Sequence, residues 1–392
     1  MNIEQIKAYN TEIFKEIVEN RRYFHQNPEL SYCEVNTAKV INQKLQEIGI
    51  ETDLSFGNNN VIGILPVNSE NKFLALRADI DALPILEENI SSYTSNNHGV
   101  MHACGHDAHI ASLLGTAKIL KKFQSELKNN ILFIFQAAEE KNPGGAKILL
   151  DSGLLSKYNI SKIIAQHIDP EIESGKIALG KGNLMASCDE IYAVFNGIGG
   201  HAAQPDKRSD TVLATINFIQ EIDQLKTEIN KQTPTLISFG KIIANGATNI
   251  VPAETSIAGT MRTYNENNRC FIKSKLQITA EKWAKKYNCS VALGISEGYP
   301  CLINDEKLFD ETLLLAEKFV GKNNILEFEA RMGAEDFSFY SHKIPALLYR
   351  TGVKGNGFGE HLLHNSKFDL DENVFLTSCG FMALLCDLEN ET

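Results

Sequence analysis

The segment Met101–His109 reads MHACGHDAH and holds side chains that can bind a metal ion or move a proton. These residues are His102, Cys104, His106, Asp107 and His109. Thiolate and imidazole groups are ligands that zinc and similar divalent ions favour. Because the chain has only 10 histidines, three of them in one short segment favour a metal site over a solvated loop. We interpret His102, and His98 before it, as loop residues rather than ligands.

Two neighbouring carboxylates, Glu139 and Glu140, follow the apolar run Asn130–Gln136. Hydrolysis at a metal needs one group that holds the ion and another that moves a proton. Adjacent side chains of an extended chain point in different directions, so the two acids can divide these tasks. Paired acids are commonplace on solvated loops, and it is their place after a strand that favours a functional interpretation.

Polar groups also follow two other apolar runs. Asp79 ends FLALRAD, with Asp81 just beyond it, and His167 ends KIIAQH. Ligands collect at the carboxyl ends of strands in open parallel sheets, so these groups would meet the acid pair in one cleft. Alone, His167 would equally suit a hydrogen-bonded histidine of the core.

The elements that must position these groups alternate between strand and helix. The runs Phe73–Asp79, Asn130–Gln136 and Lys162–His167 are typical of buried strands, and amphipathic helical patterns separate them. This alternation predicts an α/β domain with a mainly parallel sheet covered by helices. We assign residues 1–186 and 297–392 to this metal-binding, catalytic domain.

Residues 187–296 have a different order of elements. The apolar patterns predict β-α-β-β-α-β, the ferredoxin-like split unit, which can bury a core of its own. The α/β pattern resumes after it, so we predict that this α+β domain is inserted into the first.

Composition excludes several classes of partner and location. The chain has 392 residues, which suits two domains, and a net charge of −11, which disfavours nucleic acid and anionic membranes. The sequence lacks a secretory pattern at its start and any apolar run of about 18 residues. Its eight scattered cysteines indicate reduced thiols and a cytoplasmic protein. We interpret all of them except Cys104 as small core residues.

Six motifs, in this order and spacing, resemble those of the dinuclear-metal amidohydrolases. They read RADIDALP, MHACGHDAH, FQAAEE, GGHAAQP, GTMRT and LHNSKFD. The group includes hippurate hydrolases, aminoacylases that act on N-acyl amino acids, N-acetyldiaminopimelate deacetylases and auxin–amino acid conjugate hydrolases. The resemblance covers nearly the whole chain. It implies an inserted lid or dimerisation domain, a homodimer, and two divalent ions per subunit (Mn, Zn, Co or Ni).

The resemblance also implies roles for individual residues. The metal ligands would be Cys104, His106, Glu140, His167 and His364. Glu139 would be the general base, and Asp81 would orient a ligand. His201 would reach the active site of the partner subunit and stabilise the oxyanion. Asn249 and Arg262 would hold the substrate, although either one alone in a strand is more typical of a solvated or structural residue.

The chain departs from the pattern of this group at three places. Ala137 stands where proline is usual, Asp206 stands where a histidine is usual, and LHNSKFD replaces LHSPxFD. None of these changes removes an expected ligand. The change at Asp206 concerns the substrate pocket rather than the chemistry.

The expected reaction is hydrolysis of the amide bond of an N-acyl amino acid to a carboxylic acid and a free amino acid. Two alternatives remain open: a dipeptidase or carboxypeptidase on the same scaffold, and a binding protein without catalytic activity. A zinc nucleobase deaminase is excluded, since the sequence has no His-x-Glu followed by Pro-Cys-x-x-Cys. The acyl group, the amino acid and the metal remain open.

Overall fold

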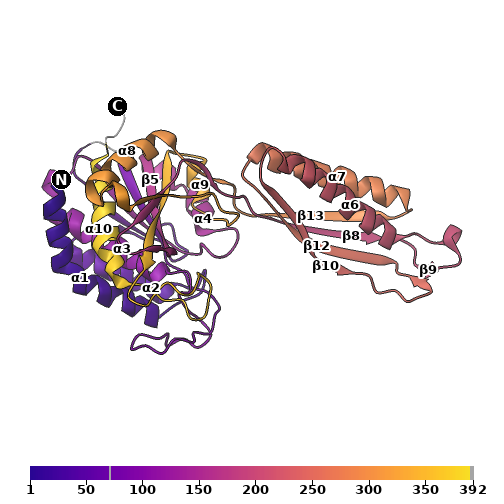
Figure 1. Ribbon diagram of the computed structural model, residues 1–392, viewed down its shortest axis with the longest axis horizontal. Coiled ribbons are helices and arrows are strands. Elements are labelled where there is room, and N and C mark those ends of the chain that lie inside the picture. The colour runs from indigo at the N-terminus through magenta and orange to yellow at the C-terminus, as the bar shows by residue number, and fades with distance from the viewer. Residues whose placement is uncertain (70–71, 389–392) are drawn as a thin grey trace. The chain divides into compact units, whose positions relative to one another are not determined.

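The computed structural model describes residues 1–69 and 72–388, which fold into two compact units (Figure 1). Unit 1 comprises Met1–Gly182, Ile303–Glu329 and the described chain from Asp336 onward. Unit 2 comprises Asn183–Leu302 and Ala330–Glu335. The sequence placed residues 330–335 in the catalytic domain. In the structure the N–H of Arg331 donates to the Leu184 carbonyl, which attaches this segment to unit 2.

Unit 1 is built on an eight-stranded sheet. In spatial order its strands are β1 (Glu51–Asp53), β2 (Val61–Leu65), β4 (Asn130–Gln136), β3 (Phe73–Asp79), β5 (Ile160–Glu173), β16 (Ala346–Lys354), β6 (Ile177–Leu179) and β15 (Ile325–Glu327). The four central strands, from β4 to β16, are parallel. Every residue of β3 and β4 is buried, which explains their continuous apolar sequences. The predicted mainly parallel α/β sheet is confirmed.

The helices of unit 1 pack around this sheet. They are α1 (Ile3–Gln26), α2 (Val35–Ile48), α3 (His106–Lys122), α4 (Gly145–Asp151), α5 (Leu154–Lys157), α8 (Glu306–Phe319), α9 (Ser338–Ser341) and α10 (Phe375–Leu384). The sequence predicted an amphipathic α3, yet 14 of its 17 residues are buried, since α3 contacts α1, α10 and β3. Two short helices, α4 and α5, follow the loop after β4. Gly153 takes φ 91° and separates α4 from α5.

Unit 2 has its own sheet and core. Its main elements are β8 (Asp189–Asn196), α6 (Thr211–Asn230), β10 (Thr235–Ile243), β12 (Glu254–Thr263), α7 (Glu266–Lys286) and β13 (Ser290–Glu297). The strand order β10-β12-β8-β13, antiparallel throughout, is that of a ferredoxin-like unit. Phe195, Phe218 and Leu276 lie fully buried at the centre of its core. The short strands β9 (Gly200–His201) and β11 (Ile250–Val251) pair with each other.

The eight cysteines are all free thiols, but not all of them belong to the core. Cys33 and Cys270 are exposed, so their assignment to the core was wrong. Cys33 follows the turn at Tyr32, and Cys270 lies on an outward face of α7. Among the described residues, none of the helices is both long and apolar enough to cross a membrane.

Candidate metal centre

A row of polar residues crosses the carboxyl end of the parallel sheet. Asp79 of β3 is the register partner of Gln136 in β4, and Arg350 of β16 is the partner of His167 in β5. Arg77 pairs with Ala165, so two residues further along Asp79 and His167 stand at the same level. The sheet therefore brings these strand ends to one edge, as their positions in the sequence predicted.

The structure brings the five predicted ligands and Glu139 together at this edge. Three overlapping groups have ligand atoms within 4.8 Å of one another: Cys104–His106–His167, Cys104–Glu140–His364 and His106–Glu139–Glu140. The Cys104 Sγ lies 3.6 Å from the His167 Nε2, and the His364 Nε2 lies 3.3 Å from a Glu140 carboxylate oxygen. The cluster therefore has the thiolate, imidazole and carboxylate donors that a borderline divalent ion prefers.

A tight backbone turn places Cys104 and His106 on the same side. Gly105 between them takes φ 78°, and a Cβ there would lie 2.0 Å from the Ile168 side chain. Only glycine fits both the conformation and the space. His364 also has a left-handed backbone, with φ 66°, and its N–H donates to the Ala103 carbonyl. Such strained residues persist only where their surroundings fix them.

The imidazoles of His106 and His167 are each oriented through one ring nitrogen. The His106 Nδ1 lies 2.9 Å from the Asp81 carbonyl oxygen, and the His167 Nδ1 lies 2.7 Å from the Ile168 carbonyl oxygen. Each Nδ1 therefore carries the hydrogen, and each Nε2 is left as a ligand atom. The His106 Nε2 is buried and makes no hydrogen bond within the described chain. These residues fit a bound metal ion.

Neighbouring groups shift the pKa values of three of the proposed ligands. Hydrogen bonds that His364 donates to Cys104 and Glu140 raise the pKa of His364 to about 10. Burial and the charge of Glu140 raise the pKa of the Cys104 thiol. Burial opposes the charged form of His106, but Asp79 and Cys104 outweigh it and hold its pKa well above the usual value. A divalent ion can replace these protons, so its binding would release them.

His109 belongs to the same motif but has other partners. Its Nδ1 contacts the carboxylate of Asp79, and its Nε2 accepts the N–H of Ile168 at 3.0 Å. Its ring lies 4.7 Å from that of His167, centroid to centroid. Asp79 also accepts from Arg77 at 2.7 Å. His109 and Asp79 thus support His167 from behind, a role that the sequence analysis did not assign to either residue.

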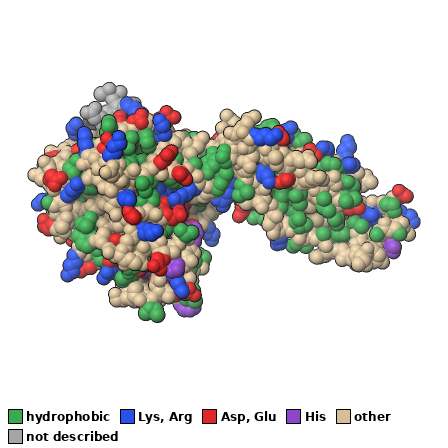
Figure 2. All heavy atoms as spheres, viewed as in Figure 1, with side chains coloured by type: hydrophobic (Ala, Val, Ile, Leu, Met, Phe, Trp, Pro, Cys, Tyr) green, Lys and Arg blue, Asp and Glu red, His purple; other side chains and the backbone are tan. Residues whose placement is uncertain are grey.

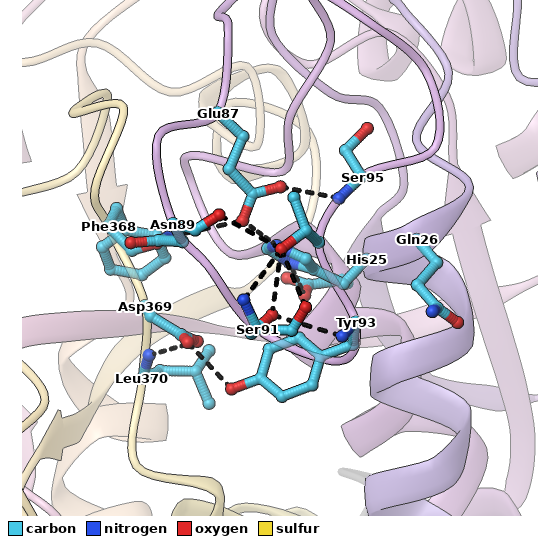
Figure 3. Close-up of polar contacts among 12 residues, drawn as sticks. His25, Gln26, Glu87, Asn89, Ser91, Tyr93, Ser95, Phe368, Asp369 and Leu370 are labelled. Atoms are coloured by element: carbon cyan, nitrogen blue, oxygen red, sulfur yellow. Dashed lines mark hydrogen bonds and ion pairs between the residues drawn. The ribbon is translucent and has the colours of Figure 1, made fainter.

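Behind the motif, Asp107 belongs to a buried charge network. It accepts from the Arg21 Nε at 2.8 Å, and its carboxylate lies 2.8 Å from the His25 Nδ1. Figure 3 shows Glu87 pointing toward the other side of His25, with an Oε1–Nε2 distance of 3.1 Å. This network connects the motif to α1, so the role of Asp107 in the structure is to bind Arg21 and His25.

His102 lies in the loop, as predicted, but it is fully buried. Burial lowers the pKa of His102 to about 4, so its imidazole is neutral. It is one of five buried histidines, and few histidine atoms reach the face of the molecule that Figure 2 shows.

The three predicted residues of unit 2 do not form one group. His201 and Asn249 are exposed and lie close together, since Ala202 donates to the Asn249 carbonyl and Ile250 is the register partner of His201. Asn249 precedes the start of β12 at Glu254, whereas Arg262 lies near the other end of this strand. At about 3.3 Å per residue, Arg262 is about 26 Å from Glu254. It is half-buried, and its Nη1 donates to the Met332 carbonyl at 2.6 Å.

The fold and this donor set define the protein as a metal-dependent amidohydrolase or peptidase. The chain belongs to the peptidase family M20/M25/M40, whose model matches residues 75–386. The resemblance seen in the sequence is therefore confirmed.

Three similar proteins show the range within this family. Thermostable carboxypeptidase 2 of Saccharolobus solfataricus is 33% identical, and the match covers 98% of both chains. N-acetylcysteine deacetylase of Bacillus subtilis is 32% identical over 98% of this chain and 99% of its own. A Bacillus subtilis crystal structure, described as a dinuclear metal binding peptidase of family M20, is 30% identical with a TM-score of 0.84. It covers 96% of this chain and 98% of its own.

Proposed function

We propose that the protein hydrolyses the amide bond of N-acyl amino acids and releases a carboxylic acid and a free amino acid. The observation that carries this proposal is the meeting of Cys104, His106, Glu140, His167 and His364 beside Glu139. The similarity to a deacetylase of an N-acetyl amino acid supports the substrate class.

The five ligands would hold two divalent ions. The buried Nε2 of His106 and the short distances around Cys104 support this assignment. Bound ions would supply a Lewis acid for the amide carbonyl and acidify the attacking water. Because one ligand is a thiolate and three are imidazoles, Mn, Zn, Co and Ni are better candidates than the harder ions Mg and Ca.

The side chains around the ligands divide the remaining tasks. Glu139, buried beside His106, takes a proton from the attacking water and delivers it to the nitrogen of the leaving amine. Asp81 orients His106, since its carboxylate lies 3.2 Å from the Nδ1. For Arg262 of unit 2 we propose a separate role, binding of the carboxylate of the amino acid, which a guanidinium suits.

We also propose a homodimer in which His201 and Asn249 act on the substrate of the partner subunit. The length of β12 between this pair and Arg262 supports the proposal, since the three residues of one unit 2 are too far apart to contact the same small molecule. The edge strand β10 exposes Leu236, Ile242 and Ile243, and Figure 2 shows hydrophobic side chains gathered on unit 2. An open apolar edge of this kind favours association.

A substrate panel tests the proposed reaction. The protein is stripped of metal and reconstituted separately with Mn, Zn, Co and Ni, then assayed with N-acetyl amino acids, hippurate and dipeptides. We expect N-acyl amino acids to give the highest kcat/KM with at least one metal. Preference for dipeptides would instead support a carboxypeptidase or dipeptidase, and no turnover with any metal would support a binding protein.

A further inference from the structure

The loop that carries the acid pair is held by side chains from three separate segments. The bonds are Ala137 N–H to the Asn60 Oδ1 (3.0 Å), Ala138 N–H to the Glu34 Oε1 (2.8 Å) and Glu140 N–H to the Asp81 Oδ2 (3.0 Å). Side chains, rather than a neighbouring strand, therefore fix the course of this loop.

Ala138, the residue immediately before the acid pair, has a left-handed backbone with φ 56°. An alanine populates this conformation about 5- to 30-fold less than the right-handed helical one. It persists only where the surroundings hold it. The contact from Glu34 to the N–H of Ala138 acts directly on this residue.

The Glu34 side chain contacts residues of two loops, Ala138 and Asn59. Glu34 occupies the N-cap position of α2, but its side chain makes no capping hydrogen bond. It is fully buried, and its second carboxylate oxygen accepts from the Asn59 Nδ2 at 3.2 Å. Burial, reinforced by the charge of Asp81, raises the pKa of Glu34 to about 7. Burying a carboxyl group is unfavourable unless it is hydrogen-bonded, and the N–H of Ala138 supplies such a bond to Glu34.

We propose that Glu34 is a positioning residue, which keeps Ala138 left-handed and so fixes the directions in which Glu139 and Glu140 leave the loop. The part of this proposal that concerns turnover rests on the proposed function. The part that concerns the ligand Glu140 does not, because it predicts an effect on metal binding whatever the substrate is.

A double-mutant cycle between Glu34→Ala and Ala138→Gly tests this role. Glycine adopts the left-handed conformation without a steric penalty, so it should make the contact from Glu34 dispensable. In the parent protein we expect Glu34→Ala to lower kcat and the affinity for Zn²⁺ by about 5- to 30-fold, with little change in KM. In the Ala138→Gly background we expect a loss of less than about threefold.

Zinc affinity is measured by competition with a chromophoric chelator, which needs no substrate. If the proposed function fails but zinc binding shows the coupling, the positioning role stands. If Glu34→Ala costs the same in both backgrounds, Glu34 does not act through Ala138 and the proposal is overturned.

Tyr32→Phe is the matched control. The Tyr32 hydroxyl donates to the Lys141 carbonyl at 2.9 Å, so its loss removes another contact to the same loop without touching the left-handed residue. Its effect should simply add to that of Ala138→Gly, and coupling as large as that of Glu34→Ala would overturn the proposal. If Glu34→Ala does not fold, Glu34→Gln replaces it in the cycle. The amide oxygen of glutamine is a weaker acceptor than a carboxylate. We therefore expect Glu34→Gln to have a smaller effect than Glu34→Ala, and this effect should again shrink in the Ala138→Gly background.

Discussion

The imidazoles of His106 and His167 are oriented by carbonyl oxygens on the side away from the proposed ligand atoms. The Asp81 carbonyl holds His106, and the N–H of Ile168 holds His109, whose ring supports His167. Such outer contacts fix which nitrogen carries the hydrogen and how far the ring can turn. The precision of the site therefore depends on residues that would never contact an ion.

Replacing Glu139 by glutamine separates metal binding from proton transfer. The amide keeps the size of the side chain but cannot accept a proton from water. We expect metal content close to that of the parent protein and a kcat lower by about 10²- to 10⁴-fold. Metal analysis of the purified variant, together with steady-state kinetics on the best substrate, measures both quantities. Parent-like turnover would remove Glu139 from the role of base.

At the scale of elements, the acid loop lies directly against the start of α4. The Gly145 N–H donates to the Ala138 carbonyl at 2.9 Å. A Cβ on Gly145 would lie 1.8 Å from the Ala137 carbonyl oxygen, so backbone touches backbone at this point. The Asp336 carboxylate accepts the next N–H, that of Ala146, and pairs with Arg77 at 2.7 Å. These contacts connect the acid loop to α4 and to β3.

Gly145→Ala should therefore disturb the centre from a distance. The added methyl group must push the acid loop away from α4, which we expect to lower the free energy of unfolding by about 1–3 kcal/mol and to weaken metal binding. Urea denaturation and the chelator competition measure the two effects. Gly294→Ala is the control, since a Cβ at Gly294 of β13 has no atom within 4 Å. Equal effects of both variants would contradict this account.

The proposed ligands could be named from the sequence because motifs and strand ends mark them. The buried strands β3 and β4 have their predicted bounds, and His167 stands where the predicted strand was expected to end, although β5 continues to Glu173. Glu34 was not predictable, because its partner Ala138 is 104 residues away and nothing local distinguishes it from a solvated acid. The Asn60 contact also needs the structure. It uses the N–H of Ala137, which the proline usual at this position would lack.

At the scale of the whole molecule, the five proposed ligands belong to unit 1, although they come from four regions of the chain. Unit 2 has a separate core, centred on residues such as Phe195 and Phe218. An ion bound by the ligands would therefore link distant segments of one unit and leave the core of the other unit unconnected to it.

Removing metal with a chelator should accordingly destabilise unit 1 alone. Hydrogen–deuterium exchange of the metal-loaded and stripped protein is the measurement. We expect faster exchange after stripping around residues 102–109, 137–141 and 362–366, and little change within 189–297, whose backbone bonds do not depend on the ligands. A uniform increase over both units would show that they unfold as one cooperative body.

The four-stranded sheet of unit 2 has its first and last residues paired with each other. Asp189, the first residue of β8, is the register partner of Glu297, the last residue of β13. Just outside this pair, the Cys188 N–H donates to the Tyr299 carbonyl at 2.9 Å. The chain from Asp189 to Glu297 therefore starts and ends at one pair of neighbouring residues, as the two strands of a β-hairpin do at their open end. A two-residue turn could join Cys188 to Gly298 and so give a shortened polypeptide without this sheet. The same two positions are where residues 189–297 could be exchanged between homologues.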